Sequence, residues 1–108
     1  MSFKVLLTDA AVRDWEELHA FIAEHDSPAA ANRVLDGIEK AVSLLTAFPR
    51  RGNYPRELLP LGIKEYREVL FKPYRIIYRV SGNLVHVYVI TDERRDMQTL
   101  LARRLLRT

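Results

Sequence analysis

The chain has 108 residues, 48% of them hydrophobic, which suits one compact domain spanning residues 1–108. No apolar run is long enough to span a membrane and no secretory leader is apparent, so we expect a cytoplasmic protein with no membrane partner. Because cysteine is absent, we expect no disulfide, and we expect no metal and no cofactor. The net charge is +3, but the charges are unevenly distributed: residues 1–48 carry 4 basic and 8 acidic side chains, and residues 49–108 carry 13 basic and 6 acidic ones. The basic second half favours an acidic partner. The alternative is that its arginines only form a solvated surface.

The chain begins with a predicted strand and helix. Residues 3–7 are a short β-rich run, and Thr8 or Asp9 follows as a residue that caps helices. Apolar residues then recur at helical spacing until about His25, which predicts an amphipathic helix. The first strand, at or near an edge of the sheet, is able to accept an added strand.

A second helix should follow at once. Asp26 or Ser27 is its predicted cap, Pro28 lies in its first turn, and its apolar stripe continues to Pro49, which ends it. Since only a few residues join the two helices, they should lie antiparallel as a helical hairpin.

The second half predicts strands and one last helix. Residues 49–62 contain three prolines and two glycines and form a loop. Strand patterns cover residues 63–71, 73–80 and 84–91, and residues 95–107 return to helical spacing. The order β-α-α-β-β-β-α predicts an α+β fold with an N-terminal strand, a helical hairpin, a three-stranded antiparallel meander and a C-terminal helix.

The pair Gly82-Asn83 predicts a two-residue turn between the last two strands. Residues that pair directly across such a hairpin share a face. Counting outward from the turn places on the face toward the helices Ile76, Tyr78, Val80, Val85, Val87 and Val89. The other face then carries Arg75, Ile77, Arg79, His86, Tyr88 and Ile90. We expect this second face to be an open concavity that receives an anionic or polar partner.

Four segments together resemble the RelE/ParE toxin superfamily of type II toxin–antitoxin systems, and the resemblance is closer to ParE-like members. They are FKVLLTDAAVRDWEEL, FPRRGNYPRELLPLGIKEYRE, KPYRIIYRV and VITDERRDMQTLLARRL, which span nearly the whole chain. The resemblance implies a small cytosolic toxin that forms a hetero-oligomer with its cognate antitoxin, whose disordered segment wraps around the toxin and neutralises it.

The superfamily divides by target, since RelE-like members cleave messenger RNA in the ribosome and ParE-like members poison DNA gyrase. RNA cleavage needs a proton-transfer group and cations that hold the phosphate. The resemblance places Arg67, Arg75 and Arg95 at the cationic positions, but Val69 falls on a strand lysine and Leu101 on the expected tyrosine. We therefore favour a non-enzymatic inhibitor of gyrase. The alternatives are a ribosome-dependent endoribonuclease that uses these three arginines, and an inactive relative that only binds partners.

The predicted partner-binding surface combines cations and apolar side chains from the strands and the C-terminal segment: Arg67, Arg75, Ile77, Arg79, Tyr88, Arg94, Arg95, Leu101 and Leu105. A structural role is the alternative for several of them. Arg67 and Arg75 are able to pair with Glu65, Glu68 or Asp96, and the apolar side of the last helix either packs on the sheet or yields its groove to an antitoxin segment.

Overall fold

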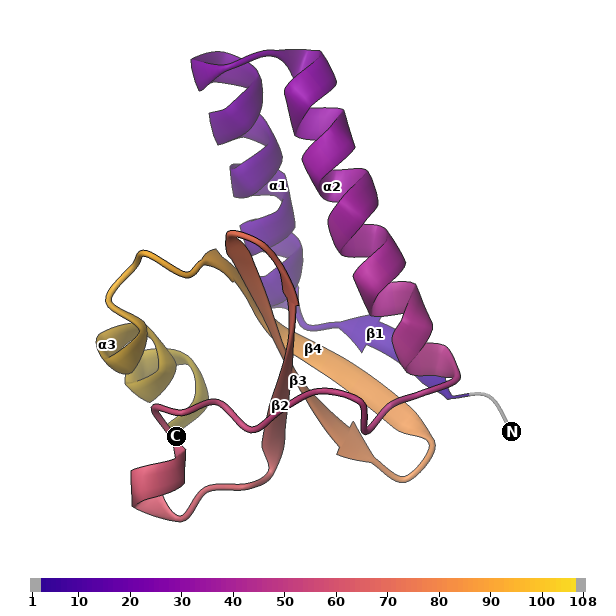
Figure 1. Cartoon of the computed structure of the whole chain (residues 1–108), viewed down its shortest axis with the longest axis vertical. Helices are drawn as coiled ribbons and strands as arrows, with labels where there is room; N and C mark the ends of the chain where they lie inside the picture. The colour runs from indigo at the N-terminus through magenta and orange to yellow at the C-terminus, as the bar shows by residue number, and fades with distance from the viewer. Residues whose placement is uncertain (1–2, 107–108) are drawn as a thin grey trace.

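The computed structural model describes residues 3–106, which form a four-stranded sheet with a helical hairpin on one side and a short helix on the other (Figure 1). In chain order the elements are β1 (Lys4–Leu7), α1 (Asp9–His25), α2 (Pro28–Ser43), β2 (Tyr66–Phe71), β3 (Tyr74–Ser81), β4 (Leu84–Asp92) and α3 (Met97–Leu101). A π-helical turn, Ala102–Leu106, continues α3. This order confirms the predicted α+β fold. Within these residues no helix is both long and apolar enough to cross a bilayer.

The sheet has the strand order β1-β4-β3-β2. The last three strands form the predicted antiparallel meander, while β1 pairs in parallel with β4 and lies at an edge, as expected. A parallel neighbour needs a long crossover, and the helical hairpin together with the meander supplies it. The first strand of the chain therefore lies directly beside its last strand.

Both helices of the hairpin begin at predicted caps. The hydroxyl of Thr8 accepts a hydrogen bond from the amide of Ala11 at 3.1 Å, and the hydroxyl of Ser27 accepts one from the amide of Ala30 at 3.0 Å. Each bond satisfies one of the amides that the first turn of a helix leaves unpaired. The positions of both helix starts are thus determined locally.

The second helix does not reach Pro49, so that prediction is wrong. Helix α2 ends at Ser43 and tightens into a 3₁₀ turn over Leu44–Thr46. The amide of Phe3 donates to the carbonyl of Thr46 at 2.8 Å, and the side chain of Leu45 is fully buried. A tighter last turn is a common way to end a helix, and here it keeps Leu45 in the core while the chain turns away.

The hairpin and the sheet enclose the main core. Its buried members come from both helices, from the 3₁₀ turn after α2 and from β2, β3 and β4: Ala11, Ile38, Leu45, Val69, Ile76, Tyr78, Val85, Val87 and Ile90. Gly37 lies so close to the ring of Phe71 that an added Cβ would approach it to 2.1 Å. The missing side chain of Gly37 therefore lets α2 cross the sheet at short range.

The hairpin register changes partway along the strands. Pairing follows the prediction from Ser81 with Leu84 to Tyr78 with Val87, but Ile77 then pairs with Val89 rather than with Tyr88. Tyr88 is the extra residue of a β-bulge. Because side chains alternate along a strand, one extra residue reverses every face assignment beyond it.

The predicted faces of two residues are consequently wrong. Val89 lies on the face away from the hairpin with Ile77, and Ile90 lies in the main core. Arg75 and Val89 therefore share a face, contrary to the expected separation of arginines from valines. Counting strand pairs outward from the turn assumes one residue opposite one residue, so it cannot predict a bulge.

The face away from the hairpin is not an open concavity, which corrects a second prediction. Helix α3 and the loop before β2 cover it with a second core: Leu58, Tyr66, Ile77, Val89, Met97, Leu100 and Leu101. The apolar side of the last helix thus packs on the sheet, the first of its two alternatives. The predicted helix extended to residue 107, and Arg107 lies outside the described residues.

Two charged side chains complete the edge of β4 where β1 stops. Beyond Val87 this edge has no strand partner, and instead the carboxylate of Asp14 accepts from the amide of Ile90 at 3.0 Å. Arg104 donates to the carbonyl of Tyr88 at 2.7 Å and to both oxygens of Asp14 at 3.0 and 2.8 Å. The Asp14–Arg104 pair thereby ties α1, β4 and the π-helical turn together.

We predict that Asp14→Ala and Arg104→Ala each lower the free energy of unfolding by about 2 kcal/mol, because each leaves buried polar partners unpaired. The double variant should lose less than the sum, since the two residues act on one interaction. Urea unfolding measures the loss, and hydrogen exchange at the Ile90 amide should accelerate in both variants. Arg103→Ala removes an exposed neighbouring cation and serves as the control; an equal loss there would contradict the assignment.

Candidate functional site

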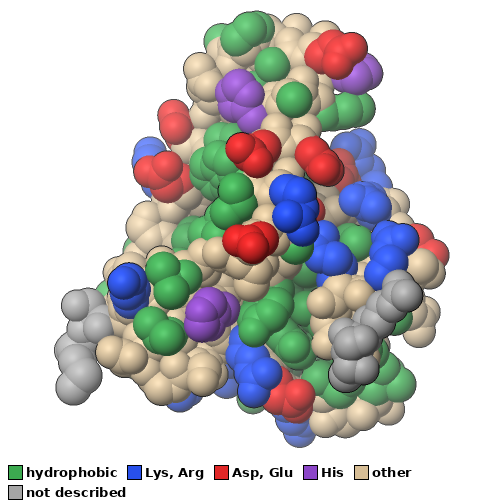
Figure 2. Space-filling model, turned by 180° about the vertical axis from the view of Figure 1, so that it is seen from behind, with side chains coloured by type: hydrophobic (Ala, Val, Ile, Leu, Met, Phe, Trp, Pro, Cys, Tyr) green, Lys and Arg blue, Asp and Glu red, His purple; other side chains and the backbone are tan. Residues whose placement is uncertain are grey.

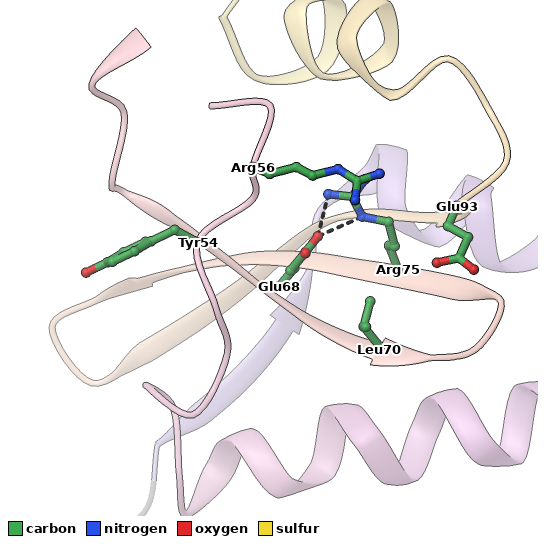
Figure 3. Close-up of a pocket in the computed structure, with 6 residues that line it drawn as sticks. All are labelled: Tyr54, Arg56, Glu68, Leu70, Arg75 and Glu93. Atoms are coloured by element: carbon green, nitrogen blue, oxygen red, sulfur yellow. Dashed lines mark hydrogen bonds and ion pairs between the residues drawn. The ribbon is translucent and has the colours of Figure 1, made fainter. Parts of the chain in front are cut away.

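Arg75 is almost completely buried, at 4% exposed, and lies between two carboxylates. Its Nε donates to Glu68 on β2 at 2.7 Å, and its two terminal nitrogens donate to both oxygens of Glu57 at 2.9 and 2.8 Å. Figure 3 shows Glu68 and Arg75 facing each other beside Arg56, at a small cavity of about 130 Å³. Of the predicted structural partners, Glu68 is therefore the one used, and Glu57 joins it from the loop.

This arrangement neutralises Arg75. The hydrogen bond from Arg75 holds the pKa of Glu57 below its ordinary value, and the bond to Glu57 raises the pKa of Arg75 further above its own, although burial opposes both shifts. Glu57 and Arg75 are thus both charged near neutral pH, and the carboxyl group of Glu68 accepts a further hydrogen bond from Arg75. Such a site repels a phosphate.

Arg67 lies on the opposite face of β2 and has neutral partners. Its guanidinium donates to the carbonyls of Arg50 and Gly52 at 3.3 and 3.0 Å and to the hydroxyl of Tyr54 at 3.2 Å, and it stacks 4.6 Å from the centre of the Tyr54 ring. Among residues 3–106 it forms no ion pair with a carboxylate. Arg67 is therefore held in place with its charge uncompensated.

The loop that receives Arg67 is fixed by close backbone contacts. The amide of Gly52 donates to the hydroxyl of Tyr78 at 3.0 Å, and Asn53 forms a β-bridge with Glu68. A Cβ on Gly52 would approach the carbonyl oxygen of Glu68 to 2.5 Å, so only glycine fits. The backbone around Arg50 is consequently ordered before any partner binds.

Arg67 shares a cleft with three more cations where β2 begins and β3 ends. We call it the basic cleft; its volume is about 200 Å³, and its lining residues are Arg50, Lys64, Glu65, Arg67, Arg79 and Val80. Arg50 and Lys64 are absent from the predicted set. The adjacent arginines at 50 and 51 are the available signal in the sequence, but only the fold brings Arg50 to the cleft that Arg79 also lines.

The remaining predicted residues lie elsewhere. Ile77 and Leu101 are buried in the second core, and Tyr88 and Leu105 pack against it. Arg94 pairs with Asp92 at 2.9 Å, and Arg95 is exposed in the turn before α3. The structure therefore divides the predicted partner-binding residues among the Arg75 site, the basic cleft, the second core and the turn before α3.

Proton-transfer groups for RNA cleavage are poorly placed. Tyr66 and Tyr88 contact each other edge to face with ring centres 5.4 Å apart, and burial raises the pKa of Tyr66 above its ordinary value. The carboxylates nearest Arg75 already accept hydrogen bonds from it. Glu93 lines the same cavity and forms no ion pair among residues 3–106, but the guanidinium of Arg75 is already held by Glu57 and Glu68.

A separate apolar groove lies between the helical hairpin and β1. Its volume is about 260 Å³, and its lining residues are Leu7, Val12, Trp15, Glu39 and Val42. Val12 is 41% exposed, whereas Ala11, which precedes it in α1, is fully buried. Seen from behind, hydrophobic side chains gather over the helical half of the molecule with acidic side chains around them (Figure 2).

Comparison with known proteins identifies relatives along most of the chain. Residues 5–97 match the family model described as the ParE toxin of the type II toxin–antitoxin system parDE. Toxin ParE3 of Caulobacter vibrioides is 27% identical over 101 residues, covering 94% of this chain and 97% of that protein. Toxin RelE1 of the same organism is 36% identical over 92 residues, covering 81% and 89%.

Solved structures show the same fold. A chromosomal ParDE toxin–antitoxin system from P. aeruginosa superposes with a TM-score of 0.69 at 17% identity, covering 84% of this chain and 96% of that one. The E. coli toxin RelE in its free state superposes with a TM-score of 0.66 at 16% identity, covering 97% and 99%. At these identities the likeness concerns the fold alone.

We predict that Glu57→Gln makes the protein less stable at neutral pH and less sensitive to acid. A carboxylate whose pKa is lowered by folding stabilises the protein fully above its ordinary pKa of 4.5 and loses that contribution as the pH falls further. The variant lacks this contribution, so its free energy of unfolding should be about 2 kcal/mol lower at pH 7 and should fall less steeply below pH 4.5.

Urea unfolding from pH 7 down to pH 3 measures both effects. Glu65→Gln makes the same change at an exposed glutamate without an ion pair among the described residues, and should leave stability within about 0.5 kcal/mol. Parallel acid profiles for Glu57→Gln and the unaltered protein would show that the Arg75 pair does not hold Glu57 ionised.

Proposed function

The chain belongs to the ParE toxin family of type II toxin–antitoxin systems, and on this basis we propose that it inhibits DNA gyrase without catalysing a reaction. We also propose that its cognate antitoxin neutralises it in a hetero-oligomer, in the cytoplasm where gyrase acts. The observation that carries the first proposal is the burial of Arg75 and its pairing with carboxylates. The arginine that a nuclease of this superfamily would use is buried and enclosed by Glu57 and Glu68.

Catalysis by the nuclease route would need that arginine to be free. A cation stabilises a developing phosphate charge only if it is aimed at the phosphate and is not already paired. Releasing Arg75 would leave two carboxylates and a guanidinium without their hydrogen bonds in a buried site, at about 3–5 kcal/mol for a broken buried pair. This unfavourable step supports inhibition by binding over RNA cleavage.

RNA cleavage remains the second candidate because the relative RelE1 is 36% identical to this chain. In that case Arg67 and Arg95, which form no ion pair within residues 3–106, would have to hold the phosphate without Arg75. The two candidates predict different targets and are separable by one comparison.

We predict that the purified toxin blocks supercoiling by gyrase and leaves messenger RNA on translating ribosomes intact. Addition of the cognate antitoxin should restore supercoiling and serves as the control. In cells, expression should cause filamentation and a DNA-damage response rather than prompt arrest of protein synthesis. Codon-positioned cuts in the RNA together with normal supercoiling would reject gyrase as the target and favour the nuclease.

The apolar groove beside β1 is the surface that we propose for the antitoxin. It combines one exposed and three half-buried apolar side chains with an edge strand, and proteins recognise partner segments both by helix-in-groove contact and by strand addition. Val12 and Trp15 line the groove from α1, and Val42 lines it from α2. The second core offers no such surface while α3 covers it.

We predict that Val12→Glu weakens antitoxin binding at least tenfold, because it places a charge in an apolar contact, an effect of about 1.4 kcal/mol or more. Calorimetric titration with the antitoxin measures the loss. Leu61→Glu is the matched control, since Leu61 is 59% exposed in the loop before β2. Equal affinity of Val12→Glu and unaltered toxin would place the antitoxin on another surface.

A further inference from the structure

We propose that the antitoxin segment seated in the apolar groove carries an arginine or lysine that pairs with Glu39, between apolar side chains that cover Val12, Trp15 and Val42. This charge preference rests on the proposal that the groove is the antitoxin surface, and it defines which antitoxin segment the groove accepts. Glu39 is then a residue by which this toxin selects its antitoxin.

Glu39 is the only charged side chain among the described residues that line the groove. It is exposed on α2 and forms no ion pair within residues 3–106. The other lining side chains are apolar: Leu7, Val12, Trp15 and Val42. A partner segment that covers these apolar side chains therefore covers the carboxylate of Glu39 as well.

The loss of water at Glu39 decides which charge the partner must bring. A carboxylate taken out of water is strongly unfavourable unless an opposite charge and its hydrogen bonds replace the water. A neutral or acidic segment would lose affinity at this position, whereas a guanidinium or ammonium group forms a charge-assisted hydrogen bond with Glu39. Filling the groove thus requires a cation beside the apolar contacts.

The two helices add negative charge around the groove. Residues three and four positions apart are neighbours on the surface of a helix. These neighbours of Val12, Trp15 and Glu39 include no arginine or lysine, but they include three exposed carboxylates without an ion pair in the described part of the chain: Asp9, Glu16 and Asp36. The cations Arg13 and Lys40 lie about 100° further around their helices than Val12 and Glu39. In Figure 2, acidic side chains accordingly border the hydrophobic ones of the helical half.

The position of Glu39, rather than its lack of an ion pair, distinguishes it from other carboxylates of the hairpin. Glu17 is also exposed and has no ion pair within residues 3–106. It lies about 140° around α1 from Val12, however, and does not line the groove. Glu17 therefore stays hydrated when the groove is filled, which makes it the matched control.

The test is calorimetric titration of full-length toxin variants with the cognate antitoxin. Glu39→Gln should bind at least tenfold more weakly, because it leaves the cation of the antitoxin buried without an opposite charge. Glu39→Lys should bind at least a hundredfold more weakly, because it adds repulsion between like charges. Glu17→Gln and Glu17→Lys should bind like the unaltered toxin. Since Glu39 is exposed, its variants should keep the urea midpoint of the unaltered toxin.

A charge exchange identifies the partner residue. Each arginine and lysine of the antitoxin is replaced by glutamate in turn, and one replacement should strengthen binding to Glu39→Lys at least tenfold while weakening binding to the unaltered toxin. Equal affinity of Glu39→Gln and the unaltered toxin would overturn the proposal. Tighter binding of Glu39→Lys would overturn it too, because it would show that the occupant is acidic.

The Val12→Glu variant separates this proposal from the choice of the groove. If Val12→Glu weakens antitoxin binding and the Glu39 variants do not, the groove remains the antitoxin surface and the cation is rejected. If none of these variants weakens binding, the antitoxin lies elsewhere and both proposals fail. A dimer of the toxin alone that Val12→Glu and Glu39→Lys dissociate, measured by sedimentation, would assign the groove to a second copy of this chain and overturn the proposal.

Discussion

The burial of Arg75 is the constraint on which the sheet face beneath α3 depends. A guanidinium removed from water needs compensating charge, and a buried pair with one partner missing is destabilised by several kcal/mol. Glu68 supplies one carboxylate from the neighbouring strand, but the second comes from Glu57 in the loop, so the loop must lie against the sheet. That position brings Leu58 into the second core. One electrostatic requirement thus organises the loop, the core beneath α3 and the site that a nuclease would use.

The arginines of this chain differ in whether carboxylates compensate their charge. Arg75 and Arg104 are partly or wholly buried, and each holds distant segments together through carboxylates. Arg67 is ordered by neutral groups and forms no ion pair among residues 3–106. Net charge alone, at +3, does not reveal this division. It follows from where each side chain finds its hydrogen-bond acceptors.

The bulge in β4 and the early end of β1 together determine how the faces and this edge of the sheet are covered. The bulge at Tyr88 changes which face Val89 and Ile90 occupy. Close to the bulge, β1 has ended, and the Asp14–Arg104 pair satisfies the backbone groups that a longer strand would have bonded. The C-terminal turn is therefore part of the sheet edge as well as a cover for the second core. Partner binding at this edge would have to displace an existing charged contact.

The sequence by itself determined the order of the elements and the turn at Gly82-Asn83, and it narrowed each helix cap to two neighbouring residues, of which the structure uses Thr8 and Ser27, because these features depend on residues close together in the chain. Its resemblance to the superfamily rested on the order of four segments along the whole chain. The sequence could not determine the bulge, the cover over the second face, or the partners of the arginines. Glu57 lies 18 residues from Arg75, and Asp14 lies 90 residues from Arg104, and no local pattern connects such pairs. Only the tertiary structure decided which cations are neutralised and which are free, because ion pairing depends on distance in space and on burial, and both are properties of the folded chain.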